Sequence, residues 1–229
     1  MTVDSPRILL IETATTVCSV GLAQGTTLVA MKEVDGDYSH AENLHVFIEH
    51  VVQMAGWKYH DLSAVAVSKG PGSYTGLRIG VSAAKGFAFS LNIPLLLIDT
   101  LQAMAGSLLQ ESSAEFLVPM IDARRMEVYT AVYDRRLNVV EPVQALIVGE
   151  DNANRYARYA SVALCGDGMD KCKTLLGTHA DISFLNNRPS AKWLAPLAYS
   201  AFVNKQFADT AYAEPYYLKE FIAGVKKTV

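Results

Sequence analysis

The chain has 229 residues, of which 51% are hydrophobic and 19% charged, and its formal net charge is −3. This composition is typical of a folded globular protein and excludes a disordered chain. It also argues against a protein that binds nucleic acid alone, because 20 Lys and Arg against 23 Asp and Glu leave no basic excess to neutralise phosphates.

The first hundred residues alternate between expected strands and helices. A short apolar run that begins after Pro6 predicts a buried strand, and two further runs separated by Gln24-Gly25 predict a hairpin. In chain order we expect strands at 7–12, 17–23 and 26–34, a helix at 39–55, a strand at 62–68, a helix from the glycine-rich segment 70–76 to about residue 91, a strand at 94–98, and a helix capped by Thr100 that runs to about residue 110.

The remainder of the chain partly repeats this order. We expect strands at 116–121, 127–133, 137–148 and 161–165, a helix after Gly168, and a last helix at 189–204. Two halves that each begin with a strand meander and continue as α/β indicate an α/β protein of two subdomains, residues 1–105 and residues 106–229.

Cysteine content and hydropathy indicate a reduced, cytoplasmic protein. Cys18, Cys165 and Cys172 are too few and too scattered for a disulfide framework or a four-ligand zinc site. The most apolar stretch, 86–98, is too short for a membrane span, and the first residues lack a signal-peptide pattern.

The segment from Lys69 to Gly80 is the most specific feature of the sequence. It joins an expected strand to an expected helix, where backbone N–H groups and the helix dipole favour an anion. Its spacing fits neither a dinucleotide fingerprint nor a Walker loop. Two interpretations stay open, a tight turn without a ligand or a nucleotide or anion site that includes Gly70, Gly72, Ser73 and Thr75.

The helix after this segment carries small residues every four positions, at Gly76, Gly80, Ala84 and Ala88. Glycine inside a helix costs roughly 1 kcal/mol relative to alanine, so a compensating contact is expected. That contact is either tight packing within the chain or the close approach of a partner helix.

The sequence gives no support for a zinc site or for a serine hydrolase. His40 and His45 lie five apart, which rotates them onto different faces of a helix, and the chain has no GxSxG motif. Two carboxylates are better placed, because Glu12 and Asp122 end the first strand of each half and would face a cleft that holds a metal-nucleotide. Each could equally be a turn residue, with Asp122 paired to Arg124 and Arg125.

Five segments carry a family resemblance that spans nearly the whole chain. They are ILLIETAT, HAENL, SKGPGSYTGLRIGVSAAKGFA, VPMIDARRMEVYTAVYD and AEPYYLK, and together they resemble the bacterial TsaB family, also called YeaZ. The resemblance implies two ribonuclease-H-like subdomains of the actin, Hsp70 and sugar-kinase superfamily. Nucleotide-hydrolysing members of that superfamily carry Asp-x-Gly-x-Thr after the first strand, whereas this chain has Glu12, Ala14 and Thr16 there. The departure argues against independent ATP chemistry.

By the same resemblance the chain is a non-catalytic partner of TsaD. With TsaE, and with TsaC supplying threonylcarbamoyl-adenylate, the two would install threonylcarbamoyladenosine beside the anticodon of tRNAs that read codons starting with A. The complex would use ATP and bind tRNA, and this chain alone would hold no cofactor and no metal.

The resemblance also places the TsaD interface on the helices at 39–55 and 76–90. Apolar contact and close approach would come from six residues, Leu44, Ile48, Val52, Gly76, Gly80 and Ala84. The isolated chain would cover the same surface by forming a homodimer, and Gly80→Leu would block the heterodimer without unfolding the monomer. The alternative is an ATP-dependent kinase or phosphohydrolase that uses Glu12, Asp122 and the 70–76 loop; a metalloprotease lacks a ligand set.

Overall fold

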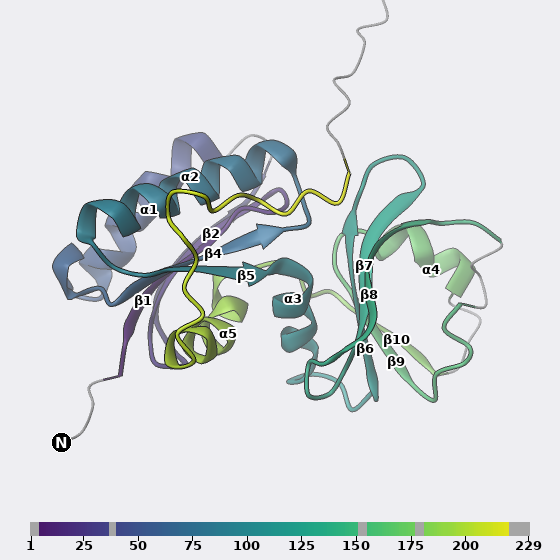
Figure 1. Ribbon diagram of the computed structural model, residues 1–229. Helices are drawn as coiled ribbons and strands as arrows, with labels where there is room; N and C mark the ends of the chain where they lie inside the picture. Colours follow the sequence, from purple (N-terminus) through teal and green to yellow (C-terminus); the bar gives the residue numbers. More distant parts are fainter. Residues whose placement is uncertain (1–4, 37–39, 151–154, 177–180, 220–229) are drawn as a thin grey trace, which may run out of the picture.

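The computed structural model describes residues 5–36, 40–150, 155–176 and 181–219. They form two five-stranded sheets that lie side by side (Figure 1). The first sheet has the order β3-β2-β1-β4-β5, from β1 (Arg7–Glu12), β2 (Val17–Gln24), β3 (Thr27–Asp35), β4 (Ala64–Gly70) and β5 (Leu95–Asp99). The second has the order β10-β9-β6-β7-β8, from β6 (Phe116–Asp122), β7 (Glu127–Asp134), β8 (Val139–Ile147), β9 (Val162–Cys165) and β10 (Ile182–Leu185).

The two sheets share one topology, which confirms the expected α/β fold of two similar halves. In each, three consecutive strands pair antiparallel, and the first of them pairs parallel with a later strand that pairs parallel with another. The second parallel strand of the second half, β10, is absent from the sequence prediction because it has only four residues and none of them is fully buried.

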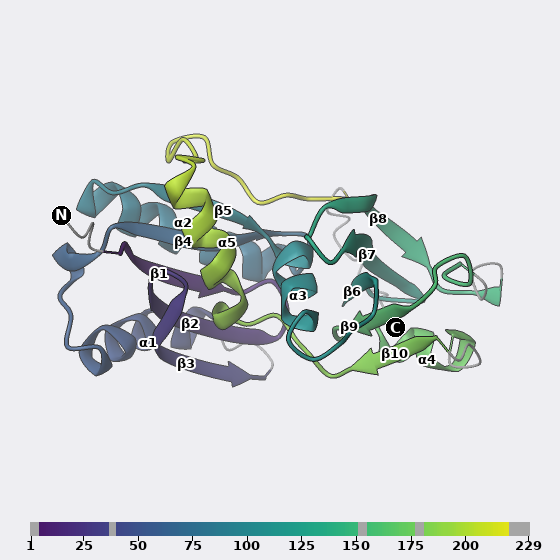
Figure 2. The same ribbon diagram turned by 90° about the horizontal axis from the view of Figure 1, so that it is seen from below.

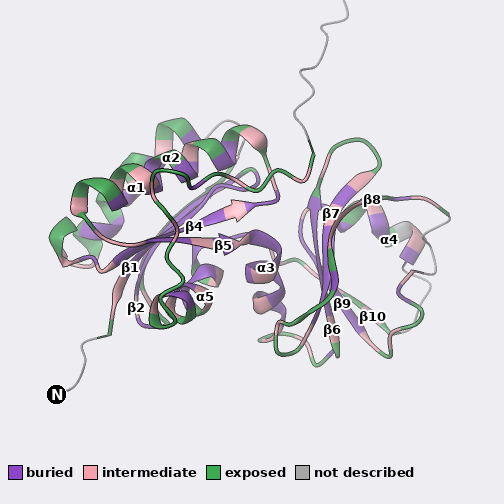
Figure 3. Ribbon diagram, in the orientation of Figure 1, coloured by how far each residue is buried: buried purple, intermediate pink, exposed green. Residues whose placement is uncertain are grey.

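Helices cover both faces of the first sheet. Helices α1 (His40–Met54) and α2 (Tyr74–Leu91) lie side by side on one face, and α5 (Ala191–Val203) lies on the other (Figures 1 and 2). The alternation of β1 explains this, because Leu9 and Ile11 join the core under α1 and α2, whereas Ile8 and Leu10 join the core under α5. Figure 3 shows the result as a buried sheet between exposed outer helix surfaces.

Two helices belong to the junction and to the second half. Helix α3 (Thr100–Leu108) contacts strands of both sheets, and α4 (Asp170–Leu176) packs Cys172 and Leu176 on the second sheet. A short 3₁₀ turn spans Tyr59–Asp61. The predicted start of α1 at Ser39 lies outside the described residues.

The predicted cap of α3 is wrong by one residue. Asp99 caps the helix, because its carboxylate accepts the N–H of Gln102 at 3.0 Å. Thr100 instead uses its hydroxyl to accept the N–H of Gly70 at 3.1 Å. The end of β5 thereby fixes the end of β4.

Helix α5 lies in the sequence of the second half but packs on the first sheet. Ala191, Leu194 and Ala198 share a core with Ile8 and Leu10 of β1. The division at residues 105 and 106 stays a prediction, and this crossing makes the first half a unit built from both ends of the chain.

The segment 208–219, called the tail below, returns across α2 toward the second sheet (Figure 1, yellow). The N–H of Ala208 donates to Leu95 O at 2.9 Å, and that of Tyr216 donates to Lys69 O at 2.7 Å. At its end, Lys219 forms an ion pair with Glu127 at the start of β7. The tail therefore connects the two halves.

Two further features bear on the sequence predictions. In the part of the chain that the structure describes, every helix is too short or too polar to span a membrane. Cys18, Cys165 and Cys172 are buried free thiols.

Candidate functional site

Glu12, the last residue of β1, is buried inside the first half, with 1% of its surface exposed. Its Oε1 accepts hydrogen bonds from the Ala14 N–H at 2.6 Å and from the Ser68 hydroxyl at 2.9 Å. Burial raises its pKa to about 7, although both hydrogen bonds act in the opposite direction. The side chain thus fastens β1 to β4 and to its own loop.

Loop 13–15, which follows Glu12, packs against the glycine-rich segment. The N–H of Ser73 donates to Ala14 O at 2.7 Å. A Cβ atom on Gly72 would lie 2.3 Å from Ala14 O, and one on Gly76 would lie 2.2 Å from Thr13 O. The backbone of this chain therefore lies against the glycines, which favours the tight-turn interpretation; the nucleotide or anion site stays a prediction.

The other residues of the glycine-rich segment also have structural contacts. The Ser73 hydroxyl caps α2 by accepting the Gly76 N–H at 3.3 Å, and Thr75 is exposed. Gly70 has φ +113°, and a Cβ there would lie 2.7 Å from Tyr216 O of the tail. The helix cap explains the residue type at Ser73, and the backbone conformation and close packing explain it at Gly70.

His40 completes the packing around loop 13–15. Its Nε2 lies 2.7 Å from Thr15 O, and its ring lies 3.3 Å from where a Cβ of Gly76 would stand. His45 is exposed, with its ring centroid 6.2 Å from that of Phe87. Within the described ranges, no group of three or more His, Cys, Asp or Glu side chains could hold a metal ion.

Asp122 occupies the corresponding place at the end of β6, but its surroundings differ. Its side chain is exposed, and its Oδ1 accepts the Arg124 N–H and the Lys171 ammonium, each at 2.6 Å. The backbone N–H of Asp122 donates to Asp167. The expected ion pair with the neighbouring arginines is wrong, since Lys171 of α4 is the partner.

The structure contradicts the predicted partner surface. All six residues are buried within this chain: Leu44, Ile48, Val52, Gly76, Gly80 and Ala84. The apolar face of α1 covers the sheet, and Gly76 and Gly80 of α2 face loop 13–15, where a Cβ on Gly80 would lie 2.2 Å from the Thr13 hydroxyl oxygen. Gly80→Leu would therefore disturb the fold, contrary to the sequence prediction. Internal packing explains this part of the small-residue pattern.

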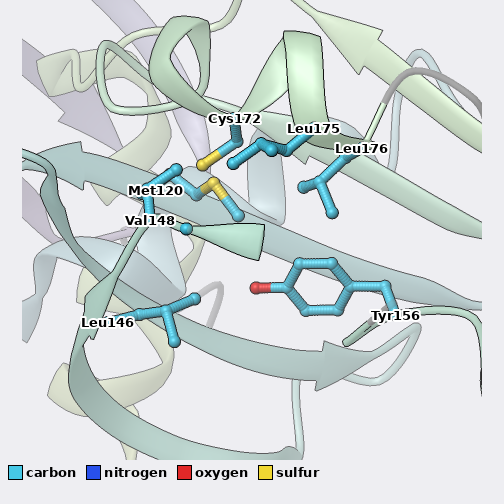
Figure 4. A pocket seen from close by; sticks show the side chains of 8 residues that line it. Met120, Leu146, Val148, Tyr156, Cys172, Leu175 and Leu176 are labelled. Carbon is cyan, nitrogen blue, oxygen red and sulfur yellow. The ribbon is translucent and has the colours of Figure 1, made fainter. Parts of the chain in front are cut away.

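A cavity of about 10 Å³ lies under the second sheet, apart from these residues. Figure 4 shows the Tyr156 hydroxyl pointing into it among apolar side chains. Burial raises the pKa of Tyr156 to about 12. The cavity has room for about one water molecule, and none of the sequence-predicted site residues lines it.

Sequence reasoning missed two features of this region. Ser68 binds Glu12 from β4, with no motif signal beyond its place at the end of an expected strand. The tail docks through its backbone and through Ala213, which is buried in the core. The AEPYYLK segment was the signal for the tail, but its contacts depend on the tertiary fold.

The repeated sheet topology, with an acidic residue ending the first strand of each half, defines the class of protein. The chain has the expected fold, with two ribonuclease-H-like halves as in proteins of the actin, Hsp70 and sugar-kinase type. The activator of the 2-hydroxyisocaproyl-CoA dehydratase from Clostridium difficile with bound ADPNP shares the fold, with a TM-score of 0.54, 10% identity, and coverage of 87% of this chain and 97% of that one.

Closer relatives identify the family. The tRNA threonylcarbamoyladenosine biosynthesis protein TsaB of Escherichia coli strain K12 is 30% identical over 227 residues, which cover 96% of this chain and 97% of that relative. YeaZ from Pseudomonas aeruginosa has a TM-score of 0.80 and 25% identity, with coverage of 93% and 100%. A family model described as TsaD, tRNA N6-adenosine threonylcarbamoyltransferase, matches residues 36–151. The chain belongs to the TsaB family.

Proposed function

We propose that this chain takes part in tRNA threonylcarbamoyladenosine biosynthesis as a subunit that binds TsaD and favours its active conformation. Relatives named for this biosynthesis match nearly the whole chain, and the match of residues 36–151 to a TsaD model supports a partner of similar fold. In this proposal TsaC supplies threonylcarbamoyl-adenylate, TsaE and ATP act on the complex, and tRNA binds to the assembly. The product lies beside the anticodon of tRNAs that read codons starting with A.

The observation that supports a non-catalytic role is the packing of loop 13–15, which follows β1, against the glycine-rich segment. Glu12 is buried and hydrogen-bonded to Ser68 and to the backbone of Ala14, and loop 13–15 lies against Gly72 and Gly76. A catalytic carboxylate must reach the reacting groups, whereas only 1% of the surface of Glu12 is exposed. The geometry thus gives no support to a kinase or phosphohydrolase.

The outer surfaces of α1 and α2 are the part of this layer that a partner can reach. Three large apolar side chains there are exposed, Val46 by 45%, Met54 by 58% and Phe89 by 81%. Ser82 and Gly86 lie on the exposed side of α2, and a Cβ on Gly86 would have no atom within 4 Å. These five residues are called the outer helix face, and we place the TsaD contact there in place of the six buried residues.

Binding through the outer helix face would act on TsaD by population shift. If this chain binds the active conformation of TsaD more tightly than the inactive one, complex formation raises the equilibrium ratio of active to inactive TsaD by the ratio of the two affinities. No catalytic group of this chain is needed. The isolated chain would form a homodimer through the same exposed face, because exposed apolar surface favours association.

Gly86→Arg tests the interface. The new side chain has open space in the monomer, so the chain should fold normally while a helix of TsaD can no longer approach. We expect Gly86→Ala to retain co-purification with TsaD and Gly86→Arg to lose it, with matching circular dichroism spectra. Co-purification of Gly86→Arg at the wild-type level would overturn this placement of the interface.

A further inference from the structure

The turn between β6 and β7, residues 122–127, holds two arginines and two carboxylates, and both carboxylates pair with lysines from outside the turn. Asp122 pairs with Lys171, and Glu127 pairs with Lys219 of the tail. Arg124 and Arg125 are exposed, and neither forms an ion pair with a described residue. Two guanidinium groups therefore face solvent in a chain whose net charge is −3.

The backbone holds both arginines in an uncommon conformation. Their φ angles are +66° and +51°, in the left-handed region that glycine, asparagine and aspartate adopt most readily. The Lys171 ammonium stabilises this turn, because it donates a hydrogen bond to Arg125 O at 2.5 Å. Two successive residues at positive φ are typical of a tight β-hairpin turn, so the hairpin of β6 and β7 fixes the backbone of both arginines.

Aromatic rings lie a short distance along the tail from this turn. Tyr217 precedes Lys219 by two residues, and its ring centroid lies 4.8 Å from that of Tyr74 at the start of α2. The Arg78 guanidinium lies 5.1 Å from the Tyr74 ring centroid. Tyr217 retains 38% exposure. Figure 1 shows the tail ending beside β7, and the ion pair of Lys219 with Glu127 joins the tail to the β6–β7 turn.

Cations beside exposed rings match the chemistry of an unpaired RNA loop. Guanidinium groups bind phosphates through charge-assisted hydrogen bonds, and tyrosine rings stack on unpaired bases of any sequence. An acidic peptide would use the arginines but would leave the rings without a role, so RNA fits the whole arrangement better.

We infer that Arg124, Arg125 and Tyr217 form a contact surface for the single-stranded loop of a tRNA. This inference rests on the proposed function for the identity of the RNA. Two arginines give weak affinity alone, which agrees with the acidic balance of the chain, so the surface acts within the complex with TsaD.

The test compares RNA binding by complexes that contain matched variants of this chain. The double variant Arg124→Asn, Arg125→Asn removes two positive charges and introduces asparagines, which tolerate a positive φ. Arg136→Asn with Lys205→Asn is the control, because it removes two exposed cations elsewhere, one of them also at positive φ. The probe is a fluorescent anticodon-arm hairpin, titrated by anisotropy at several salt concentrations, and heterodimer formation is measured separately by size-exclusion chromatography.

We expect the arginine variant to form the heterodimer normally and to bind RNA more weakly, with the slope of log affinity against log salt reduced by about 1.4 for two lost phosphate contacts. Tyr217→Leu should lower affinity roughly tenfold without changing that slope. The control should match the wild type. Unchanged RNA affinity and slope in an intact heterodimer would overturn the surface and leave the proposed function standing. A wild-type chain that forms no heterodimer would instead contradict the proposed function.

Discussion

Replacing Gly76 by alanine is expected to destabilise the folded chain by about 3 kcal/mol. The added Cβ would lie 2.2 Å from Thr13 O, whereas ordinary contacts begin at 3.4 Å. Loop 13–15 would have to move by about 1 Å, an overpacking change that costs about 1–3 kcal/mol. The loop is fixed by hydrogen bonds from Ser73 N–H to Ala14 O and between His40 and Thr15 O. Losing one of them adds about 1 kcal/mol.

Gly86→Ala on the same helix is the matched control. Its Cβ would meet nothing within 4 Å, so the variant should gain up to about 1 kcal/mol of helix propensity. For a chain of this length, 1 kcal/mol corresponds to about 2–4 °C in Tm. Calorimetry and urea unfolding should therefore place Gly76→Ala about 6–12 °C below the wild type and Gly86→Ala slightly above it. Equal stability of the two variants would refute the packing argument.

Two further predictions concern Glu12 and the tail. The pKa of Glu12 is about 7 when folded and 4.5 ordinarily, so the folded state binds more protons between these values and stability falls as pH rises through them. Urea unfolding near pH 5 and near pH 8 should show this loss to be about 2–3 kcal/mol larger in the wild type than in Glu12→Gln, and equal losses would contradict the assignment. Lys85→Met removes the ammonium that donates to Ala211 O and Ala213 O, each at 3.0 Å. In Lys85→Met, amide hydrogen exchange in the tail should be about tenfold faster or more than in the wild type. The control is Lys32→Met, which removes an exposed lysine elsewhere and should leave that exchange unchanged. Unchanged exchange in Lys85→Met would show that Lys85 does not hold the tail.

Most strands were predictable because apolar runs and turn residues determine them locally. β1 was predicted with both its ends correct, and the hairpin of β2 and β3 turns at Gly25, where φ is +62°. The sheet that α5 covers was not predictable, because its apolar face fits either half equally well. β10 lacks a strong signal since it has only four residues and none of them is fully buried.

The candidate site was predictable in position but not in orientation. Glu12 and Asp122 do end corresponding strands, yet one is buried and the other exposed. Small residues lie on both sides of α2, so the sequence alone did not show that Gly80 faces inward and Gly86 outward. Leu44, Ile48 and Val52 form the apolar face of α1, and such a face packs on the helix's own sheet before it is available to a partner.

In the proposed function, TsaD needs this chain to modify tRNA. The most direct measurement combines TsaC, TsaD, TsaE, tRNA, threonine, bicarbonate and ATP, with and without this chain, and quantifies threonylcarbamoyladenosine by mass spectrometry. The account predicts modification only when this chain and TsaD are both present. Equal modification without this chain would contradict it.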